Sequence, residues 1–287
     1  MEGISIPEGT EKPRWQVVEQ VNVARNEAVR PSEDAILVDD SCYAVLDGVS
    51  SGDSTERIDG LTPGQFAVQV GMRALKEAAE FENKEDIVPH VTKRLRESLH
   101  GRELTSSPSF VFVAFFPKHN CLIRVGDCSY LDNGVGNNLG LAFDRLKAKD
   151  RAQAITQMLA QGALPEKLLA ADPTRPRMRM LSNTIQKRLA NAPDSGRSTI
   201  FDRYRYGVIN GTDVPADLVE YIPVDGPLVL ATDGYSPAAL RMTLEETEKE
   251  NQRMIAEDPL AIGPMLSTRG IQPETIDDRA YLRVERS

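Results

Sequence analysis

Acidic residues lie at five places where a run of apolar residues begins or ends. Three of these places pair an aspartate with a neighbouring glycine, and the other two are acidic doublets. The five places are Asp47, Asp127, Asp233, Glu33–Asp34 and Asp277–Asp278. A single aspartate beside glycine at the end of a strand is usually a turn residue. Five such places in one chain predict instead that carboxylates gather at strand ends.

Gathered carboxylates repel one another strongly where the local dielectric constant is low. Divalent cations relieve that repulsion, and Mg²⁺ and Mn²⁺ prefer oxygen ligands from carboxylates, carbonyls and water. Gly48 lets the backbone next to Asp47 approach an ion closely, so its carbonyl oxygen is a further candidate ligand. The pattern therefore predicts a site for Mg²⁺ or Mn²⁺, and the sequence does not separate the two ions.

Other catalytic machinery is missing from the sequence. It contains no Walker A loop and no dinucleotide-binding glycine pattern. Zinc would need closely spaced cysteine or histidine ligands. The three histidines, His90, His100 and His119, are isolated in the sequence. The three cysteines are an odd number without a C-x-x-C spacing, and we expect them to be buried free thiols: Cys42, Cys121 and Cys128.

The composition limits the class of protein. The chain has 287 residues, of which 40% are hydrophobic and 27% charged, which is ordinary for a globular protein. A net charge of −9 argues against a nucleic-acid partner. No run approaches the roughly 20 apolar residues that span a bilayer, and the first residues do not read as a signal peptide. We expect a cytoplasmic protein with no membrane partner.

The elements that must position the carboxylates follow from local patterns. The stretch LVDDSCYAVLDG predicts two short strands around a turn at residues 39–41. A helix is predicted from Pro63, with Thr62 as its N-cap, and a second from about Lys84 to Leu99. SFVFVAFFP and CLIRVGDCSYLD predict strands joined by a hairpin at residues 118–120.

The second half of the chain begins with a helical, basic stretch and then returns to strands. Strands are predicted in RYRYGVIN, LVEYIPV, GPLVLATDGYS and DDRAYLRVE, and a helix with a capping box in TLEETEKENQRMIAED. Strand runs interrupted by helices, without regular βαβ alternation, favour an α+β fold with sheets inside and helices outside. We expect residues 1–287 to form a single domain.

In this order, the motifs SEDA, AVLDGVSSG, RVGDCSYL, LATDGYS and DDRAYLRV resemble the signatures of the PPM family of metal-dependent serine/threonine phosphatases, the type 2C protein phosphatases, in a bacterial-like form. The match runs from about Glu33 to Val284. The resemblance implies two packed antiparallel sheets flanked by helices in α-β-β-α layers, with a two-metal site in a cleft at one end. It also implies that the helical stretch at about residues 146–203 is a flap-like insertion beside the cleft.

The resemblance also implies roles for individual residues. Asp47 would bridge both metals, and Glu33 with the Gly48 carbonyl would complete the second metal's protein ligands. Asp233 and Asp277 would hold the first metal, and Asp34 would orient the water held between the ions. Asp127 matches an aspartate that helps to hold a third ion together with the residue at Asp233. Arg30 is the candidate for binding substrate phosphate, with Arg25 as its alternative.

The implied activity is metal-dependent hydrolysis of phosphoserine and phosphothreonine in proteins that a cognate kinase has phosphorylated. No covalent enzyme nucleophile is needed. Two alternatives are a pseudophosphatase that acts as a binding module and a phosphatase of a small phosphorylated metabolite. The loop Val49–Asp53, which lacks the histidine proposed as general acid in eukaryotic members, motivates the first alternative, and the unusual flap motivates the second.

Two further departures from the family pattern concern packing and substrate. Cys128 replaces a serine of the family, at a position where packing is expected to matter more than chemistry. Three arginines of the flap could meet an acidic or phosphorylated substrate, or could be an ordinary solvated helix face: Arg175, Arg177 and Arg179.

Overall fold

Two antiparallel sheets form the centre of the computed structural model, which describes residues 14–25, 31–49, 55–136, 141–197, 199, 201–268 and 277–287. One sheet has the order β2 (Ala35–Asp39), β3 (Cys42–Val49), β4 (Ser109–Phe116), β5 (Cys121–Val125) and β7 (Val219–Pro223). The other has the order β1 (Trp15–Val23), β9 (Arg279–Arg286), β8 (Leu228–Ala231) and β6 (Ser129–Asp132). The predicted fold class, an α+β fold built on a two-sheet antiparallel sandwich, is confirmed.

Side chains of the central strands alternate between two separate cores. In β3, Ala44 and Leu46 face a helical layer, whereas Tyr43 and Val45 face the second sheet. Successive residues of a strand point to opposite faces, so a strand with both faces covered needs apolar residues throughout. Every residue of β4, SFVFVAFF, is accordingly buried. This double cover fixes the ends of β3 and β4 in place.

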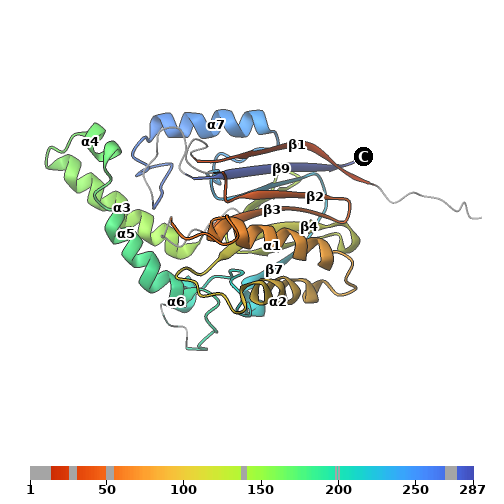
Figure 1. The fold of residues 1–287 in the computed structure, drawn as a ribbon. Coiled ribbons are helices and arrows are strands. Elements are labelled where there is room, and N and C mark those ends of the chain that lie inside the picture. Colours follow the sequence, from red (N-terminus) through yellow and green to blue (C-terminus); the bar gives the residue numbers. More distant parts are fainter. Residues whose placement is uncertain are drawn as a thin grey trace, which may run out of the picture.

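Helices cover both outer faces of the sandwich (Figure 1). α1 (Pro63–Ala78) and α2 (Ile87–Leu99, preceded by a 3-10 turn at Lys84–Asp86) pack on the five-stranded sheet. α7 (Leu244–Glu257) lies on the opposite side, beside β1 and β9. Leu244 packs near Tyr281 of β9, and its N–H donates to the Glu19 carboxylate of β1 (3.1 Å). The layers are therefore helix, sheet, sheet and helix, as expected.

A further group of helices extends from one end of the sandwich (Figure 1, green to teal). It consists of α3 (Ala142–Ala160), α4 (Pro165–Ala170), α5 (Arg175–Leu181), a π-helical turn (Ser182–Gln186) and α6 (Lys187–Leu189). Two buried cations hold it together: Lys147 pairs with Asp144 (2.6 Å) and Arg151 with Asp172 (2.8 Å). We call residues 142–205 the helical segment; that it acts as a flap remains a prediction.

Two predicted features changed in the structure. RYRYGVIN forms no regular strand: Asp202–Tyr204 is a 3-10 turn, and Tyr206 and Ile209 make isolated bridges to Ala190 and Phe110. β1 was not anticipated, because its polar and apolar residues alternate only partly and its pairing with β9 lies far away in the sequence. The three cysteines are free and buried, as predicted. Among the described residues, no helix combines the length and apolar character of a membrane span.

Candidate active site

The acidic residues lie where the ends of both sheets meet. In the five-stranded sheet, β2 and β3 run antiparallel with Ala35 opposite Leu46, so Glu33–Asp34 before β2 lie beside Asp47 at the end of β3. In the other sheet, β8 and β9 run antiparallel with Ala231 opposite Tyr281. That register brings the segment after β8, with Asp233, next to the segment before β9, with Asp277. Strand polarity alone therefore accounts for both halves of the cluster.

The charges of this acidic cluster act on one another across the two sheets. Burial raises the pKa of Asp47 well above its usual value, and the charges of Asp233, Asp34, Asp127 and Asp277 raise it further, in that order. Burial likewise raises the pKa of Asp34, with contributions from Asp233, Asp278 and Asp277, while the nearby Thr232 hydroxyl acts in the opposite direction. Burial and the Asp233 charge also raise the pKa of Asp127. Carboxylates of both sheets thus belong to one electrostatic unit.

The cluster is deep on one side and open on the other. Glu33 and Asp34 are buried, at 4% and 6% exposure, whereas Asp47, Asp127 and Asp277 are half-buried and Asp233 is exposed. A cavity of about 480 Å³ lies alongside, lined by Asn22, Ala24, Pro31 and Ser32. A solute would therefore reach the cluster from the side of Asp233.

Glu33 and the Gly48 carbonyl meet at Gly64, near the start of α1. A Cβ atom on Gly64 would lie 3.0 Å from the carboxyl carbon of Glu33 and 3.1 Å from the Gly48 oxygen. A Cβ atom on Gly48 would lie 2.6 Å from the Glu33 carbonyl oxygen and 2.9 Å from the Gly64 carbonyl carbon. Only glycine fits such close backbone approaches. The Glu33 carboxylate and the Gly48 carbonyl are therefore neighbours.

Thr62, which the sequence identified only as a helix cap, also holds a site residue. Its hydroxyl donates to the Glu33 carboxylate and accepts from the Gln65 backbone N–H (3.2 Å). The Gln65 side chain accepts from the Thr62 N–H (3.1 Å) and donates to the carbonyls of Pro31 and Ser32 (3.1 and 3.2 Å). The capping box of α1 thus fastens the chain around Glu33, a link between distant residues that no local pattern predicts.

Asp278 is a second positioning residue without an assigned role in the sequence. It is buried, and its carboxylate accepts from the backbone N–H groups of Arg25 (2.6 Å) and Glu33 (2.9 Å). It therefore ties the start of β9 to the segments that follow β1 and precede β2. The doublet Asp277–Asp278 was the available signal in the sequence, but only the fold shows that Asp278 binds the backbone N–H groups of Arg25 and Glu33.

Hydrogen bonds to Glu248 of α7 hold the loop that carries Asp233. The Tyr235 hydroxyl donates to the Glu248 carboxylate of α7 (2.5 Å), and Arg279 donates to the same carboxylate (3.2 Å). On the inner side, buried Thr232 accepts from the Ala280 N–H through its hydroxyl oxygen (2.8 Å). The loops carrying Asp233 and Asp277 are therefore joined by α7 and by their own strands.

The donor set fits hard divalent cations. One carboxylate oxygen of Asp34, Oδ2, is buried and makes no hydrogen bond to any residue that the structure describes, which is costly for a polar atom unless a ligand or water supplies a partner. The charges of Asp233, Asp278 and Asp277 act on Asp34, and carboxylates are oxygen donors of the kind Mg²⁺ and Mn²⁺ prefer. In the described part of the chain, however, no group of three or more His, Cys, Asp or Glu side chains is arranged to hold an ion. The carboxylates are close enough to affect one another's pKa, but their oxygens do not converge on one ion position in the described residues.

Several predicted residues lie outside this cluster or outside the described chain. Arg30 and the loop residues 50–53 are not among the described residues. Arg25 is described, and its N–H bond to Asp278 places its backbone at the cluster. Cys128 is buried, and burial raises the pKa of its thiol. The three arginines of α5 are exposed, and Arg177 pairs with Asp150 (2.7 Å).

Comparisons with known proteins identify similar solved structures. No protein-family model and no curated protein sequence matches the chain. The Mycobacterium tuberculosis serine/threonine phosphatase PstP/Ppp is 13% identical with a TM-score of 0.49, and the alignment covers 96% of this chain and 99% of that one. The PPM Ser-Thr phosphatase MsPP from Mycobacterium smegmatis is 16% identical with a TM-score of 0.44, and the alignment covers 94% of this chain and 99% of that one. The serine/threonine phosphatase Stp1 from Staphylococcus aureus is 12% identical with a TM-score of 0.48, and the alignment covers the whole of both chains (100% and 100%). Similarity at this level does not assign side chains, so the roles of the acidic residues depend on the cluster itself.

Proposed function

We propose that this chain is a PPM-type protein phosphatase that hydrolyses phosphoserine and phosphothreonine with divalent metal ions. The observation that carries the proposal is the acidic cluster, where carboxylates from both sheets raise one another's pKa around a buried Asp34 oxygen without a partner. Such an arrangement destabilises the fold unless cations are bound. The chain would tolerate this loss of stability because the site binds cations.

The proposed ligands follow the arrangement of the strands. Asp47, which interacts with members of both sheets, would be shared by two ions. Glu33 and the Gly48 carbonyl, adjacent at Gly64, would belong to one ion, and Asp233 with Asp277 to the other. Asp127, whose pKa the Asp233 charge raises, would hold a third ion together with Asp233. Mg²⁺ and Mn²⁺ both suit this set.

When bound, two such ions would activate a water, aim it at the phosphorus and offset charge on the phosphoryl oxygens. The remaining work belongs to the chain. Asp34 Oδ2 can accept a hydrogen bond from the attacking water, because nothing else in the structure occupies it. Arg25, or Arg30, would bind the phosphoryl oxygens of the substrate. The P–O bond to the serine or threonine would break as the water oxygen bonds to phosphorus, and the released alkoxide would take up the proton that the water gives up.

The open side of the cluster suits a protein substrate. Asp233 is exposed, so a phosphorylated side chain on a larger molecule could enter without the chain opening first. The natural partners would be phosphoproteins made by a serine/threonine kinase, in the cytoplasm. The three thiols are buried, which leaves no accessible cysteine among them for a covalent route.

The first experiment is hydrolysis of p-nitrophenyl phosphate and a phosphothreonine peptide, with and without Mn²⁺, by the wild type and Asp233→Asn. Metal-dependent turnover of both substrates that the variant loses is the expected result. Metal binding without turnover would favour a pseudophosphatase. Turnover of p-nitrophenyl phosphate but not of phosphopeptides would favour a small phosphorylated metabolite, and the absence of metal binding would overturn the proposal.

A further inference from the structure

A cavity of about 700 Å³ lies in the helical segment, away from the acidic cluster. One wall comes from the π-helical turn and α6, through Ile185, Arg188 and Leu189. The other comes from the loop that follows, including Arg197 and Phe201. Cavities of this size accept side chains or small ligands, and their few polar groups set which ligand is chosen.

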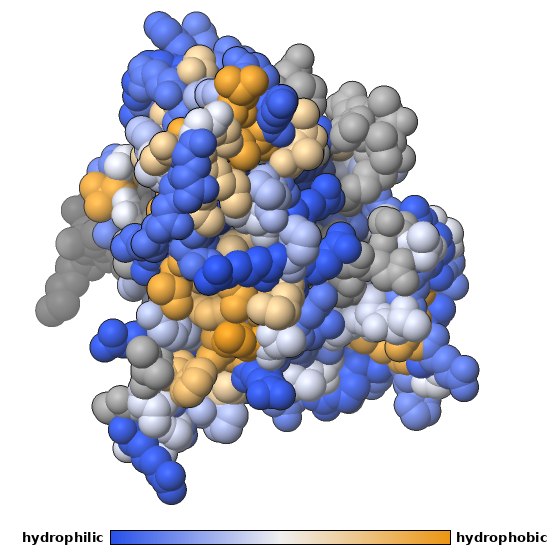
Figure 2. Space-filling view, turned by 90° about the vertical axis from the view of Figure 1, so that its left-hand side faces the viewer, coloured by the Kyte–Doolittle hydropathy of each residue, from blue (hydrophilic) through white to orange (hydrophobic). Residues whose placement is uncertain are grey.

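The lining combines cationic and apolar groups. Arg188 and Arg197 have no ion pair or hydrogen bond for their guanidinium groups within the described residues, and Arg205 at the base has its Nε buried without a partner. Phe201 is 60% exposed at the rim. In Figure 2, which looks onto the end of the molecule formed by the helical segment, hydrophobic side chains gather in the middle among hydrophilic ones. The cavity therefore suits an anion that carries an apolar side chain.

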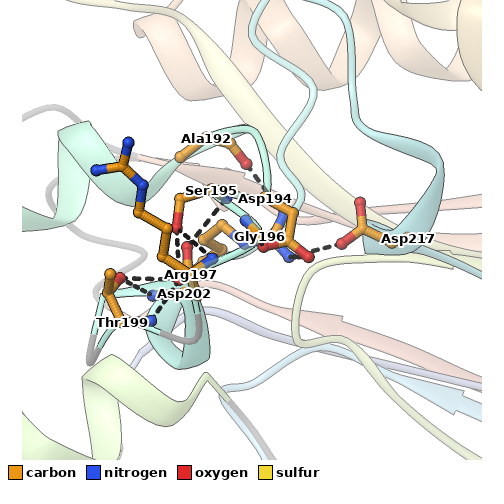
Figure 3. A network of polar contacts seen from close by, with 9 residues as sticks. Ala192, Asp194, Ser195, Gly196, Arg197, Thr199, Asp202 and Asp217 are labelled. Atoms are coloured by element: carbon orange, nitrogen blue, oxygen red, sulfur yellow. Dashed lines mark hydrogen bonds and ion pairs between the residues drawn. The ribbon is translucent and has the colours of Figure 1, made fainter.

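The acidic residue in the lining does not neutralise these arginines. Figure 3 shows Asp202 surrounded by donors of its own loop, while the Arg197 guanidinium extends away from it. The Asp202 carboxylate accepts from the N–H and hydroxyl of Thr199 (2.7 and 2.8 Å) and from the Ser195 hydroxyl (2.8 Å). These bonds lower the pKa of Asp202 to about 2. Asp202 thus shapes the loop and leaves the guanidinium groups of Arg188 and Arg197 available, while Arg205 pairs with Asp217.

The cavity is fixed to the neighbouring parts of the fold through Arg205 and Tyr206. Arg205 pairs with Asp217 (2.6 Å) and donates to the Ala192 carbonyl (3.2 Å), which anchors the loop from both sides. The next residue, Tyr206, bridges to Ala190, and its phenol pKa is raised by burial first and then by the charges of Asp144 and Asp127. The bridge from Tyr206 to Ala190 therefore fixes the end of the cavity loop to the residue that follows α6.

We propose that this cavity binds an acidic segment of the protein substrate, a segment that carries carboxylates next to an apolar side chain. This rests on the proposed function for the source of the ligand, but not for the binding itself. Charge complementarity supports it: residues 142–205 hold 13 Lys and Arg against 6 Asp and Glu, whereas the rest of the chain holds 21 against 37. A polyanion would be repelled elsewhere and attracted here.

The test is binding of a fluorescein-labelled, unphosphorylated peptide with the core Glu-Glu-Phe-Glu-Glu, followed by anisotropy in EDTA at 150 mM salt. Arg188→Glu with Arg197→Glu should weaken binding at least about tenfold. The matched control is Lys187→Glu with Arg203→Glu, which makes the same charge change on exposed neighbours that do not line the cavity. It should weaken binding less than about threefold. Melting temperatures of both variants exclude misfolding.

Equal weakening by the two double variants would overturn the proposal, since only overall charge would then matter. So would a peptide core of Glu-Glu-Gly-Glu-Glu that binds as tightly as the one with phenylalanine, or the absence of peptide binding to the wild type. Because the measurement uses no metal and no phosphate, it is independent of catalysis. Hydrolysis without peptide binding would refute only the cavity, and cavity-dependent binding without hydrolysis would refute only the phosphatase.

Discussion

The acidic cluster and the helical segment hold buried charge in opposite ways. In the helical segment, buried Lys147 and Arg151 each have a carboxylate of the same segment within 2.8 Å, and Arg151 also donates to the carbonyls of Leu260 and Ala261. In the cluster, buried carboxylates have other carboxylates as neighbours, and they raise one another's pKa. Charge that the chain neutralises itself stabilises a fold, whereas charge left uncompensated needs something from outside. The comparison therefore separates a structural charge network from the proposed metal site.

The largest expected effect is on the residue that interacts with both halves of the cluster. Asp47→Asn should lower metal-dependent hydrolysis of p-nitrophenyl phosphate at least about a hundredfold, because a shared metal ligand is lost. The same variant should melt at a higher temperature than the wild type in EDTA, since one repelling charge is gone. Steady-state kinetics and thermal melts check the two halves. A variant that stays fully active, or that melts lower without metal, would mean that the cluster is structural like the helical segment.

Adding Mn²⁺ to the wild type should raise its melting temperature if the acidic cluster binds the ion. At a Mn²⁺ concentration 100 times its Kd, mass action stabilises the folded state by about 2.7 kcal/mol. For a chain of this size that is a rise in Tm of roughly 5–10 °C. The rise should disappear in Asp233→Asn, measured by the same melts with matched Ca²⁺ and K⁺ controls. An equal rise in the variant would place the ion elsewhere.

Thr62→Val tests whether the N-cap of α1 also positions the metal site, in comparison with the N-cap of α7, Thr243. Losing the hydroxyl removes both the α1 cap and the bond to Glu33, so Mn²⁺ affinity should fall about tenfold and stability by about 1 kcal/mol. Thr243→Val is the matched control: Thr243 caps α7 by accepting from the Glu246 N–H (3.3 Å), and its hydroxyl also donates to the Glu246 carboxylate. It should cost similar stability without changing metal affinity. Thr62→Ser should restore both properties, and equal metal affinities for the two valine variants would remove Thr62 from the site.

The smallest effect is expected at an exposed ion pair far from both regions. Lys76 in the last turn of α1 pairs with Asp39 at the end of β2 (2.6 Å), and the bonds from Lys76 and Ser41 lower the pKa of Asp39 to about 2. A lowered carboxyl pKa stabilises the fold above the unfolded value near 4, and that stability is lost as the pH falls toward 2. Because Lys76 is 63% exposed, Asp39→Asn should cost less than about 1 kcal/mol at pH 7. Urea unfolding at pH 7 and pH 2.5 checks this: the difference should be smaller at the lower pH, and a difference that grows there would contradict the sign.

The helices and strands that carry the site were largely predictable, because their signals are local. Thr62 and Pro63 mark the start of α1, and unbroken apolar runs mark β4 and β5 as buried strands. β1 and the 203–210 segment were missed because their structure depends on partners: β1 on its pairing with β9, and Ile209 on a single bridge to Phe110. Pairing between distant residues leaves little trace in local composition.

The sequence by itself identified the candidate metal ligands, because an aspartate at the end of an apolar strand is costly wherever that strand is buried. It could not determine which members of the acidic pairs face the cleft. Asp278 binds the backbone N–H groups of Arg25 and Glu33, and Thr62 reaches Glu33 across 29 positions. Nor did it reveal that the exposed arginines of α5 lie outside the cavity, while Arg188 and Arg197 line it. Contacts of this kind depend on the distance between side chains after folding, which only the tertiary structure decides.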